Sequence, residues 1–264
     1  MFGFRKNTDK NAYLYRKFVF KMFIVLLAAV LPAIAILYFI YRKDDLRTEP
    51  PKQIVSAFFL GMLSALASML ISTPLNYLGF FTEEASTTGE HLAHAFFGAA
   101  FPEELAKLVI LWMFLRKNAY FDEWVDGIVY AACVGLGFAA LENVFYLFED
   151  LDEWVTVGIL RAFMSIPAHF FFAVTMGYFV SRACFGDYEK HRWNSILALV
   201  CPMILHTLYD FPLMMSETSE IAGSLLFLFF GLYIFMAVKS KKFYLAHHAV
   251  DAEAMGQSED SDQA

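Results

Sequence analysis

The sequence predicts an all-α membrane protein, a polytopic bundle of about seven transmembrane helices. Of its 264 residues 59% are hydrophobic and 18% are aromatic, and the mean hydropathy is +0.51. A soluble domain of this length is only about half apolar. The apolar residues lie in continuous blocks of about 20 residues, the length that crosses a hydrocarbon core of roughly 30 Å. Strands of a lipid-spanning barrel would alternate instead, so we expect helices.

Each apolar block is expected to form one transmembrane helix. Pro102 suits the first turn of a helix, so the third span is either one helix or two pieces. In the second case residues 91–101 form a separate or re-entrant segment, and the bundle has eight helices. Pro167 interrupts the fifth span. Gly135 and Gly137 in the fourth span are small enough for neighbouring helices to approach closely. The seven spans are approximately 22–41, 54–81, 91–115, 125–148, 154–180, 196–214 and 221–238.

The two ends of the chain differ in composition from the middle. Residues 1–21 hold six basic side chains and flank the first span, and residues 22–240 form the expected transmembrane domain. Residues 241–264 end in an acidic, polar sequence, which predicts a disordered tail. Nothing in the sequence indicates binding to nucleic acid. The three cysteines are scattered, so they indicate neither a disulfide framework nor a thiolate zinc site.

Lys and Arg in the loops predict the orientation in the membrane. The loops after spans one, three and five carry four, two and three of them, and the tail carries three. The loops after spans two, four and six carry none, which places the C-terminus in the cytoplasm. With seven spans the N-terminus then lies outside, despite its six basic residues. Either the N-terminus departs from the rule that Lys and Arg lie on the cytoplasmic side, or the number of spans differs from seven by one.

Two adjacent glutamates and a lysine, Glu103, Glu104 and Lys107, interrupt the third apolar span. An ionised side chain at bilayer depth costs several kcal/mol unless it is paired, hydrated or bound, so this stretch indicates function. At about 1.5 Å per residue, Glu104 lies about 18 Å from the inner face. Spans four, five and six place ionisable groups in this same layer, which predicts one shared site. These groups are Glu142, His169, His206 and Asp210.

The charges in this layer do not balance. The acids are Glu103, Glu104, Glu142 and Asp210, and the bases are Lys107 and Arg161. Two negative charges remain if all six ionise, so the site must hold protons or a divalent cation. Either answer suits hydrolysis, because a protonatable carboxylate is a general base and a metal ion makes hydroxide from water.

These residues stand in four ordered motifs, and in this arrangement the chain resembles the PrsW family of intramembrane proteases over residues 38–214. The family is itself similar to the CAAX prenyl protease and bacteriocin-processing superfamily. The resemblance implies a membrane-embedded peptidase of the bacterial cytoplasmic membrane that cuts a membrane protein substrate, in one branch an anti-sigma factor. The motifs are Glu103-Glu104-x-x-Lys107, Asp126-Gly127-Ile128-Val129-Tyr130 leading into Gly135 to Asn143, Ser165-x-Pro167-x-His169, and His206-x-x-x-Asp210.

Four residues are the expected catalytic set. Glu103 and Glu104 would supply the base that activates water, although a plain Glu–Lys packing pair is the alternative. His169 and His206 would bind metal or hold the attacking water and the oxyanion, and hydrogen bonding between helices is their alternative. Zn²⁺ is the candidate metal, with a metal-free glutamate mechanism as the alternative. Its candidate ligands are His169, His206, Glu104 and Asp210.

Supporting roles are expected for five further residues. Lys107 would neutralise a neighbouring glutamate. Asp210 either binds the metal or orients His206. Glu142 is a ligand or acid, or else the partner of Arg161. Asn143 donates a hydrogen bond either to the substrate carbonyl or to a helix carbonyl.

A different class of protein can also need buried Glu, His and Asp. A proton- or ion-coupled transporter would spread such groups along a path across the bilayer, ideally on discontinuous helices. Here they share one depth, which favours the enzyme. A catalytically silent membrane scaffold is the third reading, and the intact set of ionisable residues argues against it.

Overall fold

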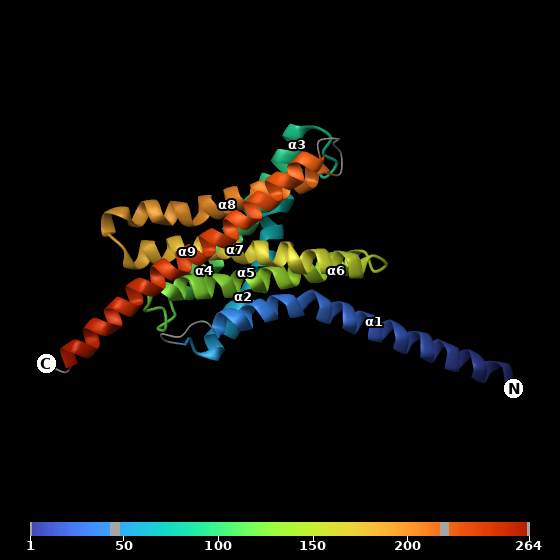
Figure 1. The fold of residues 1–264 in the computed structure, drawn as a ribbon. Helices are drawn as coiled ribbons and strands as arrows, with labels where there is room; N and C mark the ends of the chain where they lie inside the picture. Colours follow the sequence, from blue (N-terminus) through green and yellow to red (C-terminus); the bar gives the residue numbers. More distant parts are fainter. Residues whose placement is uncertain (1, 43–47, 217–221, 263–264) are drawn as a thin grey trace.

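The computed structural model describes residues 2–42, 48–216 and 222–262 (Figure 1), and these residues contain helices but no strand. The prediction of an all-helical fold is therefore confirmed. The helices are α1 (Phe2–Tyr41), α2 (Pro51–Tyr77), α3 (Thr88–Ala93), the π-helix η1 (His94–Ala100), α4 (Phe101–Leu115), α5 (Trp124–Glu149), α6 (Trp154–Phe163), α7 (Ser165–Phe185), the 3₁₀-helix η2 (Tyr188–Lys190), α8 (His191–Ser216) and α9 (Ala222–Asp262).

Five stretches within the described residues are long and apolar enough to cross a membrane, which confirms a multi-pass membrane protein. The predicted count of about seven is not confirmed. The third predicted span corresponds to α3, η1 and α4, and residues 222–238 of the seventh lie in α9; neither is among the five. The five are Tyr13–Tyr41, Pro51–Tyr77, Trp124–Glu149, Trp154–Phe185 and Tyr188–Met215.

The third predicted span is one continuous helix with a π-helical insert. The backbone stays in the right-handed helical region at both junctions, His94 and Phe101. Pro102 explains the insert, because its ring has no N–H and clashes with the carbonyl four residues earlier in a regular helix. Within the insert the Phe101 N–H donates to Phe96 O, five residues back. The change of register ends directly before Glu103 and Glu104.

The fifth predicted span is broken in two, as Pro167 suggested. Met164 separates α6 from α7 with φ −114° and ψ −64°. A regular helix through this point would bring the ring of Pro167 against the carbonyl of Phe163. The break lies toward the end of the bundle where the chain turns from α5 into α6 (Figure 1).

Helix α5 lies at the centre of the bundle and packs on α1, α2 and α7. Glycines allow this close packing, as the sequence predicted. A Cβ on Gly137 would run into the carbonyl oxygen of Phe58 on α2, and one on Gly135 would meet Ala173 on α7. The small residues let the backbones of α2, α5 and α7 approach closely one to two turns before Glu142.

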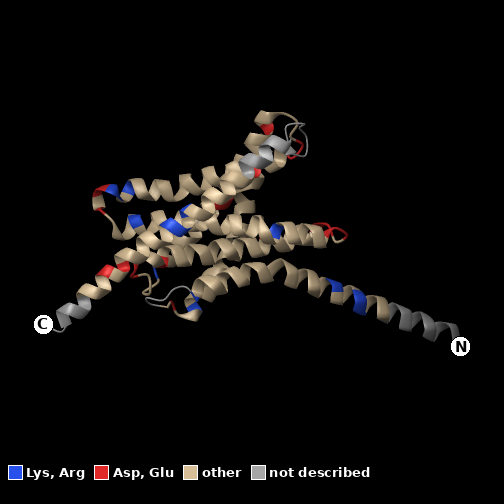
Figure 2. Cartoon of the chain, in the orientation of Figure 1, with Lys and Arg blue, Asp and Glu red and all other residues tan. Residues whose placement is uncertain are grey.

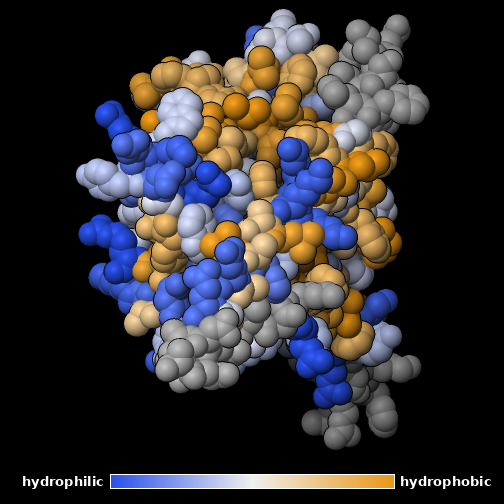
Figure 3. All heavy atoms as spheres, turned by 60° about the vertical axis from the view of Figure 1, so that its left-hand side comes forward, coloured by the Kyte–Doolittle hydropathy of each residue, from blue (hydrophilic) through white to orange (hydrophobic). Residues whose placement is uncertain are grey.

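The outer surface is strongly apolar. Leu70 is 78% exposed and Phe163 is 74% exposed, and Figure 3 shows hydrophobic side chains over much of the visible face. Soluble monomers rarely expose continuous apolar areas of this kind, so the bundle belongs in lipid. Figure 2 shows many basic residues at the end of the bundle where α9 leaves it, and the acidic turn between α5 and α6 at the other end, where the N-terminal part of α1 carries further basic residues.

The C-terminal segment differs from its prediction. Residues 241–262 were expected to be disordered, but they continue α9 as a helix. The reason is a set of contacts with the bundle: both oxygens of Asp251 accept hydrogen bonds, from the Trp124 and Val125 N–H groups at 2.9 Å each. His247 is 2% exposed and stacks on Tyr178 of α7. The acidic residue caps the otherwise unpaired N–H groups at the start of α5.

Candidate active site

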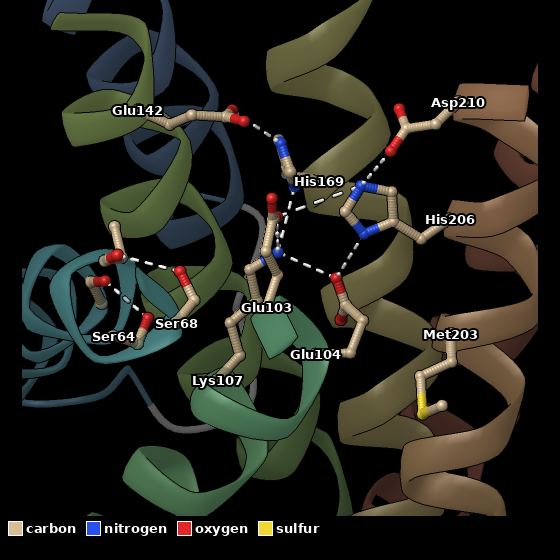
Figure 4. Close-up of polar contacts among 12 residues, drawn as sticks. Ser64, Ser68, Glu103, Glu104, Lys107, Glu142, His169, Met203, His206 and Asp210 are labelled. Atoms are coloured by element: carbon tan, nitrogen blue, oxygen red, sulfur yellow. Dashed lines mark hydrogen bonds and ion pairs between the residues drawn. The ribbon is translucent and has the colours of Figure 1, made fainter. Parts of the chain in front are cut away.

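The ionisable residues predicted to share one layer meet in the bundle core (Figure 4). Helix α4 brings Glu103, Glu104 and Lys107, α7 brings His169, and α8 brings His206. Of the two glutamates, Glu104 is fully buried and Glu103 has 13% of its side chain exposed. The helices therefore turn the polar faces of their predicted motifs toward one centre and away from lipid.

Lys107 lies at the middle of this centre. Its ammonium donates to Glu104 Oε1 at 2.8 Å and to Glu103 Oε2 at 3.4 Å, and it contacts His169 Nδ1 at 3.1 Å. It also lies 3.8 Å from the centre of the Phe138 ring. An ammonium group can only donate, so His169 accepts at Nδ1 and carries its proton on Nε2. The prediction that Lys107 neutralises a neighbouring glutamate agrees with these contacts.

The two histidines are held in the same way. His169 Nε2 lies 2.9 Å from Glu142 Oε2, and His206 Nε2 lies 3.0 Å from Asp210 Oδ2. Each Nε2 thus faces an outer carboxylate, while each Nδ1 faces the centre, where His206 Nδ1 lies 3.0 Å from Glu104 Oε1. Carboxylates commonly fix metal-binding histidines through the second ring nitrogen. This contact with His206 is the one that the second predicted role of Asp210, orienting the ring, requires.

Glu142 and Asn143 connect the site to the helices around it. Glu142 pairs with Arg161 of α6, the partner that the sequence offered as one alternative, and also with His169, which the sequence did not indicate as a partner. The Asn143 amide donates to Ala29 O of α1 at 3.1 Å, and its oxygen accepts from Arg161 Nε at 2.6 Å. Of the two predictions for Asn143, the bond to a helix carbonyl is the one that the structure contains.

Four residues offer metal-binding atoms that all lie within 4.8 Å of one another: Glu103, Glu104, His169 and His206. The ligand set predicted from sequence differs at one position, because it contained Asp210 in place of Glu103. The reason is geometric. Asp210, one helical turn beyond His206 on α8, lies 3.0 Å from Nε2 of the ring but outside the group of atoms that gather within 4.8 Å. Glu103 of α4 lies 3.9 Å from the same nitrogen and belongs to that group.

The donor set suits a divalent cation. Two imidazole nitrogens and two carboxylates are ligands that Zn²⁺ accepts, and the outer carboxylates on both histidines supply the usual support. Glu104 Oε2 is buried and has no hydrogen-bond partner among the described residues. The Lys107 ammonium already stands among these groups as a cation. A metal ion at this position would take over part of its contacts.

A cavity of about 500 Å³ opens onto the site. Glu103, His169 and His206 reach its wall, whereas Glu104 and Lys107 lie behind them. Tyr146 and Tyr209 also line it, and neither was predicted from the sequence. A signal was available, since Tyr146 follows Glu142 by four residues and Tyr209 follows His206 by three, spacings that share a helix face.

Comparison with known proteins agrees with this geometry. A family profile described as "PrsW family intramembrane metalloprotease" matches residues 49–238. The chain belongs to the PrsW family. It is 35% identical over 191 residues to Protease PrsW of Bacillus subtilis, covering 72% of this chain and 83% of that protein. For Protease PrsW of Geobacillus kaustophilus the identity is 35% over 196 residues, or 74% and 82% of the two chains.

A third relative, Protease PrsW of Clostridioides difficile, is 35% identical over 192 residues, which is 72% of this chain and 79% of that protein. No solved structure is significantly similar to the chain. Membership of the PrsW family makes the protein an intramembrane peptidase, with a membrane protein as substrate and a bacterial membrane as its setting. The transporter alternative is not favoured.

Proposed function

We propose that this protein hydrolyses a peptide bond within or near the membrane by activating water at the centre formed by Glu103, Glu104, His169 and His206. The observation that carries the proposal is the convergence of these four residues from three helices to within 4.8 Å, beside a cavity. Family membership supports the reaction class. Regulated cleavage of a protein resembling an anti-sigma factor is the substrate class that the family resemblance suggests.

The two glutamates have different parts in this proposal. Glu103 borders the cavity and is the base that takes a proton from water as the oxygen attacks the scissile carbonyl carbon. It returns that proton to the leaving nitrogen when the C–N bond breaks, so the proton count balances. Glu104 does not reach the cavity, and its contacts hold Lys107 and His206 in place.

A divalent ion, for which Zn²⁺ is our proposal, would be held by Glu104, His169 and His206, which leaves Glu103 free to act as the base. Such an ion, when bound, polarises a carbonyl and supplies hydroxide near neutral pH. The protein's own part is to fix both imidazoles: Glu142 and Asp210 hold their outer nitrogens. Arg161 in turn holds Glu142, and Asn143 ties this end of α5 to α1.

The orientation and the division of the chain are also proposals. We place the C-terminus in the cytoplasm, because most Lys and Arg lie at that end of the bundle (Figure 2). Residues 22–240 are taken as the protease domain, with residues 1–21 and 241–264 as flanking segments. The family match over residues 49–238 falls inside this central part.

A cleavage assay in lipid bilayers tests the proposed function. The probes are single-span fusion proteins whose transmembrane segments come from bacterial membrane proteins, with products mapped by mass spectrometry. Glu103→Ala, Glu104→Ala, His169→Ala and His206→Ala should each abolish cleavage at normal protein levels, whereas Glu84→Ala in the exposed loop before α3 should not. Undiminished cleavage by all four variants would refute the proposal, and ion flux without cleavage would favour a transporter.

A further inference from the structure

Two cavities meet at the site. The larger cavity, of about 500 Å³, lies among η1 and α4–α8, and a smaller one, of about 200 Å³, lies among α2, η1, α4 and α5. Glu103, Glu142 and Tyr146 line both of them. The side chain assigned as the base therefore stands at the boundary between two hollows, with space on either side of it.

The larger cavity combines the polar centre with an apolar outer wall. Its far side is formed by aliphatic and thioether side chains, from α6, the break at Met164 and the end of α8. Leu160 from α6 is 53% exposed and belongs to this wall. The volume lies within the range of about 300–1,000 Å³ typical of binding pockets. A bulky apolar side chain fits such a space.

The smaller cavity is walled mainly by small side chains on the side of α2 and η1. Ala65, Ser68 and Ser72 come from three successive turns of α2, and Gly98 comes from η1. A Cβ on Gly98 would run into the ring of His94, so this position has no room for a side chain. Met69 is the long side chain that α2 contributes to the cavity.

A substrate must present an open backbone to this centre. In a transmembrane helix every carbonyl within the segment is already hydrogen-bonded to an N–H of the same helix. An unwound stretch is tolerated at membrane depth only where protein or water satisfies its polar groups, and the cavities beside Glu103 and Arg161 offer that setting. In an extended chain neighbouring side chains point to opposite sides.

We propose that the two cavities are subsites of one cleft that binds an unwound stretch of the substrate across Glu103. The larger subsite takes a bulky apolar residue on one side of the scissile bond, and the smaller subsite takes a small residue on the other side. Leu160 and Met69 then determine which residues are accepted. This inference rests on the proposed peptidase function and adds to it the type of sequence that is cut.

Two substitutions with matched controls test the proposal. Leu160→Phe reduces the larger subsite, and its control is Ile159→Phe, because Ile159 is 56% exposed on the same helix and does not line the cavity. Met69→Ala enlarges the smaller subsite, and its control is Leu70→Ala, because Leu70 is 78% exposed beside it. The probes are the single-span fusion proteins, with Ala, Leu or Phe placed at each position flanking the mapped cleavage site.

Selectivity of kcat/KM is the measured quantity. Leu160→Phe should lower the preference for Leu and Phe over Ala about 10-fold at one flanking position, the scale of small changes in an apolar pocket. Met69→Ala should raise the acceptance of Leu over Ala about 10-fold at the other position, and neither control should shift either preference.

Three results would overturn the two-subsite cleft: unchanged selectivity in both variants, shifts at the same flanking position, or equal shifts in the controls. In each case cleavage that still depends on Glu103 leaves the proposed function intact. If the wild-type protein cleaves no probe, both proposals fail.

Discussion

Replacing Glu104 by Gln separates catalysis from charge balance at the centre of the site. The substitution keeps the shape of the side chain and removes its charge. Glu104 is 0% exposed, and its Oε1 lies 2.8 Å from Lys107 Nζ and 3.0 Å from His206 Nδ1. Removing one partner of a buried ion pair costs about 3–5 kcal/mol, because the other charge stays buried. Glu103 still contacts Lys107, so we expect the lower end of this range.

The double variant Glu104→Gln/Lys107→Met tells the two roles apart. It removes both charges, and a buried pair replaced by neutral groups is often close to neutral in stability. Most of the lost stability should therefore return. Glu103 loses its cationic neighbour in this variant, but its carboxylate borders the cavity and can be hydrated. Cleavage should stay about 10–100-fold below wild type in both variants, the usual effect of losing a group that holds a site residue in place, here His206.

Unfolding in detergent gives the stability, and kcat/KM on a single-span probe in bilayers gives the activity. Glu84→Gln, in the exposed loop, is the matched control and should change neither. If the double variant regained full cleavage, Glu104 would serve only to neutralise Lys107, and our assignment of it to the reaction centre would be wrong. Unchanged cleavage in the single variant would lead to the same conclusion.

Two further predictions concern the frame that holds the site. Asp251→Ala removes the cap on the Trp124 and Val125 N–H groups and should lower the free energy of unfolding by about 1–2 kcal/mol in a denaturant titration. Asp251→Asn should recover part of the lost stability. Unchanged stability of Asp251→Ala would contradict the docking of α9 on α5. Gly137→Ala sets a Cβ against the Phe58 carbonyl and should cost about 1–3 kcal/mol by thermal unfolding, so unchanged stability would contradict close α2–α5 packing.

Much of the candidate site was predictable because a charge in lipid is expensive. Glu103, Glu104 and Lys107 stand out within an apolar run, and the regular rise of a helix is enough to place His169 and His206 at the same depth. Since helices must face any such groups inward, convergence follows without knowledge of the tertiary structure.

The contacts between helices were not predictable in the same way. Which nitrogen of His206 meets Asp210 depends on how α8 is rotated, and packing between helices sets that rotation. The ligand set from sequence therefore contained Asp210 rather than Glu103. The number of spans was also uncertain, because Pro102 and Pro167 do not show whether a helix bends, breaks or takes a π-helical insert.

Local composition misled the prediction for the C-terminal segment. Acidic and polar residues near the end of the chain suggested disorder, yet residues 241–262 are helical. The stabilising contacts come from distant parts of the chain: Asp251 caps α5, and His247 packs against α5 and α7. A reading of local composition cannot detect partners more than a hundred residues away.

The metal content of the purified protein tests the central claim most directly. If Glu103, Glu104, His169 and His206 form one centre that holds the ion, elemental analysis after purification with Zn²⁺ should find about one zinc per chain in the wild type. His169→Ala and His206→Ala should lose it, and His247→Ala, a buried histidine outside the site, should keep it. Metal-free wild-type protein that cleaves its probe at full rate in the presence of chelator would contradict the account.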